Sequence, residues 1–162
     1  MWQFKLILDY LDLLTTIFLP LMFNVPNYRN IMEKVIPFHQ VLGLKLIEMR
    51  EGYAAIKIPF KQELVGDPRT NSIHGGVIST ALDAAGGAAG ITTLTGSEDQ
   101  IATVDIHIDY LDAGRPEDII VEGQIVRNGS SLVYTQMKAH HEGDNKIIVQ
   151  ARAVYRVKRQ AK

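Results

Sequence analysis

The chain has 162 residues, enough for one domain with its own hydrophobic core, and 46% of them are hydrophobic and 22% charged. The formal net charge is -1, so no basic field marks the chain as a nucleic-acid-binding protein. The absence of cysteine excludes disulfides, cysteine–zinc sites and a cysteine nucleophile, and it fits a reducing compartment such as the cytoplasm.

Residues 1–23 form a strongly apolar N-terminal extension. Four polar residues recur along it at the spacing of one helical face: Lys5, Asp9, Asp12 and Thr16. This pattern predicts an amphipathic helix, and its charges together with Pro20 argue against a transmembrane span. Three interpretations stay open. The helix packs on its own domain or a partner subunit, it lies on a membrane surface (less favoured, because the stripe is poor in Lys and Arg), or translation starts at Met22 or Met32.

Residues 24–162 are predicted to form one domain, with a sheet on one side and a single long helix on the other. The first two strands are expected at 44–50 and 53–60, two short runs rich in apolar residues. Glu51 and Gly52 between them form a plausible hairpin turn. A polar loop follows and leads to the helix.

The helix is predicted over 73–95, and residues 101–157 are predicted to form four antiparallel strands, with a type I′ turn at Asn128-Gly129. The first of these strands alternates between two faces, with Ala102, Val104, Ile106, Ile108 and Tyr110 on one and Thr103, Asp105, His107 and Asp109 on the other. Thr103 is therefore expected to point away from the apolar face. Two strands, one helix and four more strands predict an α+β domain.

The predicted helix contains five glycines within residues 71–90, NSIHGGVISTALDAAGGAAG. Each interior glycine destabilises a helix by about 0.5–1 kcal/mol relative to alanine. On a helical wheel one side is apolar and carries Val77, Ile78, Ala81, Leu82, Ala85 and Ala89. Another stripe carries Gly76, Ser79, Thr80, Asp83, Gly86, Gly87 and Gly90. Two interpretations stay open, because such a stripe allows close packing against another element or the approach of a ligand.

His74, Gly75 and Gly76 stand where the helix is predicted to begin. The first amides of a helix lack internal partners, so they can polarise a carbonyl group, although His74 can also be a simple capping residue. Asp83 follows His74 by nine residues, or roughly 13 Å along the axis. The Gly75 amide and Asp83 are therefore not expected to meet within one subunit. They could meet across a two-fold axis, which predicts a dimer with two composite sites.

Three segments resemble hotdog-fold acyl-CoA thioesterases of the phenylacetate-degradation (PaaI-like) type. They are HGGVISTALDAAGG, ATVDIHIDYLDAGRPED and IVRNGSSLVYTQMKAHHEGDNKIIVQARAVYRV, and the similarity spans residues 37–157. The resemblance implies a long central helix wrapped by a curved antiparallel sheet, here with an extra N-terminal helix. It also implies homodimers, in many members paired into homotetramers, and hydrolysis of an acyl-CoA thioester without a metal or another cofactor.

The resemblance also assigns roles to residues. Gly75 would donate its N–H to the thioester carbonyl, His74 would shape that loop, and Asp83 would be the general base or the nucleophile. Thr103 falls where some members carry a serine that helps to position the water. Pro68 stands where many members carry an asparagine, so a second polar partner for the carbonyl is not evident.

Residues of the predicted third hairpin would bind the CoA nucleotide by the same resemblance: Arg127, Ser130 and Ser131. Two alternative functions remain. One is a non-catalytic acyl-CoA-binding hotdog protein, and the other is an acyl-thioester hydratase. The intact Asp83 favours hydrolysis, and the sequence does not indicate which acyl group is bound.

Overall fold

The computed structural model describes residues 25–96 and 99–159. The predicted extension 1–23 and its boundary with the main domain lie outside these ranges. No helix within the described ranges has the length and apolar character needed to cross a membrane.

Short helical segments precede the sheet. Helix α2 (Val25–Asn30) runs into a π-helical segment (Ile31–Val35), and α3 (Pro37–Leu42) follows. Met32 and Leu42 are buried, so one side of these segments belongs to the core. Gly43 ends α3 with a φ of 74°, a left-handed conformation that glycine adopts without a steric penalty.

Six antiparallel strands form the main sheet in the order β1-β2-β6-β7-β8-β5. Their bounds are Lys45–Arg50, Tyr53–Ile58, Ile119–Asn128, Leu132–His141, Ile147–Lys158 and Gln100–Tyr110, respectively. The predicted division into two strands before the helix and four after it is confirmed. A short 3₁₀ turn (Gln62–Leu64) and a two-stranded ribbon of β3 (Val65–Asp67) and β4 (Ser72–Ile73) lie between β2 and the helix.

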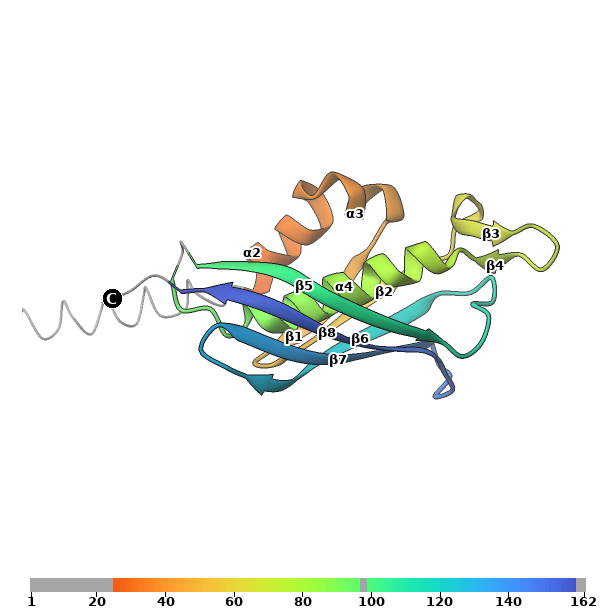
Figure 1. Ribbon diagram of the computed structural model, residues 1–162. Coiled ribbons are helices and arrows are strands. Elements are labelled where there is room, and N and C mark those ends of the chain that lie inside the picture. Colours follow the sequence, from red (N-terminus) through yellow and green to blue (C-terminus); the bar gives the residue numbers. More distant parts are fainter. Residues whose placement is uncertain (1–24, 97–98, 160–162) are drawn as a thin grey trace, which may run out of the picture.

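Helix α4 (Gly75–Ile91) lies along one face of the sheet and contacts all six strands (Figure 1). It begins and ends a few residues inside the predicted range of 73–95. The predicted apolar side is buried: Val77, Ile78, Ala81, Leu82, Ala85 and Ala89. A sheet wrapped around a long central helix is the α+β hotdog arrangement that the sequence predicted.

Glycines allow α4 and the sheet to approach each other closely. A Cβ at Gly86 would collide with the hydroxyl of Tyr155, and a Cβ at Gly90 would lie 2.5 Å from a methyl group of Ile101. On the sheet side, a Cβ at Gly123 would lie 2.6 Å from the main chain of Ala85. Of the two interpretations of the glycine stripe, close helix–sheet packing therefore accounts for Gly86 and Gly90.

Two local predictions are wrong. The turn between β6 and β7 is not type I′, because neither Asn128 nor Gly129 has the positive φ that this turn requires. The clean alternation expected in β5 is also interrupted, because Thr103 pairs with Tyr155 whereas Asp105 pairs with the next residue along, Val154. This β-bulge inserts one residue into β5 and reverses the direction of the side chains that precede it.

Candidate active site

The start of α4 leaves one main-chain donor free. His74 is the N-cap residue, and its Nδ1 accepts a hydrogen bond of 2.9 Å from the Gly76 N–H. The Val77 N–H donates to the His74 carbonyl at 3.0 Å. The Gly75 N–H has no acceptor among the described residues. His74 is thus the capping residue that the sequence left open as one alternative, and its cap leaves Gly75 as the available donor.

The peptide group between Gly75 and Gly76 is held from both sides. Its carbonyl oxygen, that of Gly75, accepts hydrogen bonds of 3.0 Å from Tyr110 Oη and 3.0 Å from Ser79 Oγ. The two hydroxyls are also hydrogen-bonded to each other. Its N–H, that of Gly76, donates to His74. These contacts fix the conformation of Gly75 and so the direction of its free N–H. Sequence reasoning placed Tyr110 on the apolar face and gave it no such role.

Asp83, in the third turn of α4, is held by residues from two strands. Thr103 Oγ1 on β5 donates to Asp83 Oδ1 at 2.9 Å. Tyr155 Oη on β8 donates to the Asp83 main-chain oxygen at 3.0 Å and to Oδ1 at 3.3 Å. Burial and the neighbouring Asp83 carboxylate raise the pKa of Tyr155, so its phenol stays protonated and remains a donor.

The β5 bulge explains why Thr103 reaches Asp83. Before the bulge Thr103 faces α4, and after it Ile106, Ile108 and Tyr110 do so, whereas Val104 at the bulge is exposed. The expectation that Thr103 points away from the apolar face is therefore wrong. A bulge adds one residue without changing the composition of a strand, so strict alternation could not reveal it.

Gly75 and Asp83 both lie on the side of α4 that faces β5. Tyr110 on β5 contacts Gly75, and Thr103 on the same strand contacts Asp83. The two groups are eight residues apart on a continuous helix, which corresponds to about 12 Å along the axis. This exceeds the reach of one reacting carbonyl group. Strand β5 is an edge of the sheet, so both groups lie beside an edge.

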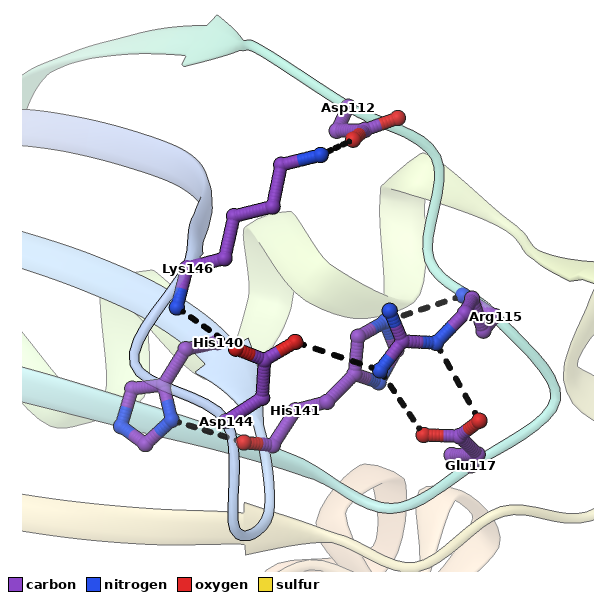
Figure 2. A network of polar contacts seen from close by, with 7 residues as sticks. All are labelled: Asp112, Arg115, Glu117, His140, His141, Asp144 and Lys146. Atoms are coloured by element: carbon purple, nitrogen blue, oxygen red, sulfur yellow. Dashed lines mark hydrogen bonds and ion pairs between the residues drawn. The ribbon is translucent and has the colours of Figure 1, made fainter.

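A polar network supports the loop beside the start of α4 (Figure 2). The Arg115 guanidinium pairs with Glu117 and Asp144, at 3.1 and 3.3 Å, and its main-chain N–H donates to Nε2 of the buried His141. The loop in turn accepts a hydrogen bond at the Gly114 oxygen from the N–H of Ile73, directly before His74. The network therefore helps to hold the chain segment that leads into Gly75.

The residues expected to bind CoA lie at the other end of α4. Arg127, Ser130 and Ser131 are exposed around the β6–β7 turn. A further cation, Arg159, holds this turn: it donates to the carbonyl oxygens of Gly129 and Ser130, at 3.2 and 2.7 Å. The sequence motifs gave no indication of this contact of Arg159.

Within residues 25–96 and 99–159 no three His, Asp or Glu side chains gather closely enough to hold a metal ion. The adjacent His140 and His141 point to opposite faces of the sheet. His140 contacts Glu122 at 3.1 Å, whereas His141 is fully buried.

Known proteins resemble this chain in the region that contains α4 and the residues described above. The model of the thioesterase superfamily matches residues 70–148, which include α4 and strands β5, β6 and β7. A medium/long-chain acyl-CoA thioesterase, YigI of Salmonella typhimurium, is 32% identical over 133 residues, covering 75% of this chain and 85% of the relative. The chain belongs to the thioesterase superfamily. By that membership it is a thioester hydrolase.

Two further relatives agree with this assignment. Acyl-coenzyme A thioesterase 13 of Pongo abelii is 27% identical over 126 residues, covering 75% of this chain and 85% of that protein. A crystal structure of a thioesterase-superfamily protein from Shewanella oneidensis superposes with a TM-score of 0.77 at 28% identity and covers 86% of this chain and 99% of that one. The hotdog fold is thus common to this chain and the solved relative.

Proposed function

We propose that this protein hydrolyses acyl-CoA thioesters at composite sites, each made by Gly75 of one subunit and Asp83 of the other. The observation that carries the proposal is the free N–H of Gly75 at the start of α4, on the same side of the helix as a carboxylate that two strands hold in place. The names of the acyl-CoA thioesterases that resemble this chain support the substrate class.

The chemistry requires only these two groups. The Asp83 carboxylate takes a proton from water while the water oxygen forms a bond to the thioester carbon. The carbonyl electrons move onto its oxygen, where the Gly75 N–H stabilises the developing charge. The carbon–sulfur bond then breaks, the electron pair leaves with CoA as a thiolate, and the thiolate takes up a proton. In the alternative mechanism Asp83 is the nucleophile: its carboxylate attacks the thioester carbon, CoA leaves as a thiolate, and water hydrolyses the resulting mixed anhydride.

The separation of Gly75 and Asp83 supports a site that is shared between subunits. About 12 Å along one helix is too far for a single carbonyl carbon and its oxygen. A two-fold axis beside the β5 edge would bring Gly75 of one chain toward Asp83 of the other, and it would create two such sites in each dimer. The pairing of dimers into tetramers is a further part of the proposal that rests on the family resemblance.

The substrate is proposed to be a medium- or long-chain acyl-CoA, as in the name of the YigI relatives. The CoA nucleotide would lie near Arg127, Ser130 and Ser131, where one exposed cation and two hydroxyls are available for phosphate groups. The CoA-binding role rests on the resemblance alone.

The direct test is thiol release from acyl-CoAs of increasing chain length and from an aromatic acyl-CoA. Wild type, Asp83→Asn and Asp109→Asn are compared. Asp109 is a matched control because it is an exposed carboxylate on β5 paired with His107. Activity that falls by about 10²-fold or more in Asp83→Asn alone supports the proposal, in line with the loss of a general base. If wild type binds acyl-CoA but releases no thiol, the non-catalytic alternative is correct, and consumption of an unsaturated acyl-CoA without thiol release would indicate a hydratase.

A further inference from the structure

The two carboxylate oxygens of Asp83 have different surroundings. Oδ1 accepts hydrogen bonds from Thr103 Oγ1 at 2.9 Å and from Tyr155 Oη at 3.3 Å. No described residue donates a hydrogen bond to Oδ2, and none of the described Lys, Arg or His side chains forms an ion pair with Asp83. One oxygen is therefore occupied by the protein and the other is available.

We propose that Tyr155 is a positioning residue which, together with Thr103, fixes the rotamer of Asp83 so that Oδ2 is the atom presented to water or to the thioester. The assignment of Oδ2 and the role of Tyr155 rest on the proposed function of Asp83. Tyr155 does not touch the reacting atoms and acts through Asp83.

The position of Tyr155 suits this role because its side chain is enclosed by its neighbours. The side chain is 2% exposed, and it stands directly opposite Thr103 in the β5–β8 pairing. Opposite residues of an antiparallel pair project from the same face, so both hydroxyls reach α4 together. Gly86 leaves the space for the phenol beneath the helix, since a Cβ there would collide with Tyr155 Oη.

The hydrogen-bonding pattern of Tyr155 explains how it restricts Asp83. A phenol has one hydroxyl hydrogen. Here that hydrogen is shared between two acceptors of Asp83, its main-chain oxygen and Oδ1. The side chain of Asp83 is thereby tied to its own backbone, while Thr103 holds the same oxygen from β5. A rotation about χ2 away from this orientation would break both side-chain hydrogen bonds. Because the two carboxylate oxygens are equivalent, one of them always returns to the position held by Thr103 and Tyr155, and the other is the one presented.

The groups that face Asp83 from the packed strands are Thr103 on β5 and Tyr155 on β8, and both donate to the same carboxylate oxygen. Loss of the Tyr155 hydroxyl should therefore loosen the carboxylate and slow the chemical step, with little effect on substrate binding. A purely structural tyrosine would affect stability without lowering kcat at an unchanged KM.

The experiment compares Tyr155→Phe with Tyr53→Phe in the full-length dimer. Tyr53 is the matched control, because its hydroxyl also donates to a carboxylate, Glu122 Oε2, at 3.1 Å but away from α4. We expect Tyr155→Phe to lower kcat by about tenfold with KM changed less than about twofold. Tyr53→Phe should leave both constants unchanged. The inference is wrong if the two variants have the same kcat and KM.

A measurement on the unmodified protein separates this inference from the proposed function. The carboxyl carbon of Asp83 and the Cζ of Tyr155 are labelled with ¹³C and followed by NMR as the pH is changed. A common titration midpoint for both signals supports the contact between the two residues. This readout requires neither thiol release nor a folded Tyr155→Phe variant. A Tyr155 signal that is unchanged while Asp83 titrates would overturn it.

Discussion

The start of α4 and its third turn differ in what provides the functional group and in what holds it. At the start, the group is a main-chain N–H, and it is directed by side chains of His74, Ser79 and Tyr110 around the next peptide. In the third turn, the group is the Asp83 carboxylate, held by two strand hydroxyls. A main-chain donor can be removed only by changing the backbone, whereas the carboxylate can be altered atom by atom. The two regions therefore need different variants.

The largest effect is expected from Gly75→Pro. Proline lacks the N–H, and it is well tolerated at the first position of a helix. His74 already has φ -62° and ψ 129°, which a residue before proline adopts readily. Loss of this single donor should lower kcat by roughly 10²–10³-fold, as for other oxyanion donors.

The control for this variant is Gly75→Ala. It keeps the N–H but introduces a Cβ that would lie 3.1 Å from the Tyr110 ring. Proline introduces the same Cβ, so the two variants share this crowding. A smaller loss in Gly75→Ala than in Gly75→Pro assigns the difference to the amide. Equal losses in steady-state kinetics would mean that crowding at Tyr110, and not the donor, explains the effect.

The next effect in size tests the packing that holds the third turn. Gly86→Ala should lower the free energy of unfolding by about 1–3 kcal/mol, as expected for overpacking, because the new Cβ would collide with the Tyr155 hydroxyl. At the neighbouring Gly87 a Cβ would stand 3.6 Å from Tyr155 Cε1, an ordinary contact. Gly87→Ala should therefore stabilise the helix by about 0.5–1 kcal/mol. Urea unfolding of the two variants checks the opposite signs, and destabilisation by both would contradict this account of the stripe.

Tyr110→Phe tests how the peptide group after Gly75 is held at the start of α4. It removes one of the two hydroxyls on the Gly75 oxygen and leaves Ser79 in place. We expect a loss of about 0.5–1.5 kcal/mol in stability and a several-fold fall in kcat. Tyr134→Phe, at an exposed tyrosine of β7, serves as the control. The same kcat for both variants would show that Ser79 alone is sufficient to hold the peptide.

The smallest effect concerns the network that supports the loop near Gly75. Burial lowers the pKa of His141 from its ordinary value of 6.5, so the unfolded chain binds a proton more readily than the folded protein. The resulting stability is fully present above about pH 6.5 and is lost as the pH falls below it. His141→Gln should make the dependence of the unfolding free energy on pH shallower than in the wild type between about pH 7 and 5. Equal slopes in denaturant titrations would contradict this.

The sequence was sufficient for the succession of strands and helix along the chain, for α4 and its buried side, and for the choice of Gly75 and Asp83 as candidate groups. These features depend on local periodicity and on helix geometry, which a sequence contains directly. The supports of both groups could not be predicted. Tyr110 and Tyr155 are separated from their partners by 35 and 72 residues, and their contacts depend on strand register.

The β5 bulge illustrates the same limit. Alternation placed Thr103 on the polar face, and the one inserted residue turned it toward Asp83. Tyr155 fitted the alternation of an ordinary core residue. Its apolar ring explains that pattern, so the pattern does not reveal that the hydroxyl of the same side chain is a donor. A possible signal was Gly86, since a helical glycine facing a sheet indicates that a large group needs the space.

The most direct test of the composite site is complementation between two inactive variants. Gly75→Pro and Asp83→Asn are co-expressed with different affinity tags, and the mixed dimers are isolated. Each mixed dimer would contain one site with both groups intact and one site with neither, so it should recover about half of the wild-type kcat per dimer. Mixed dimers that remain as inactive as the two parent variants would contradict the account, because Gly75 and Asp83 would then have to act within one subunit.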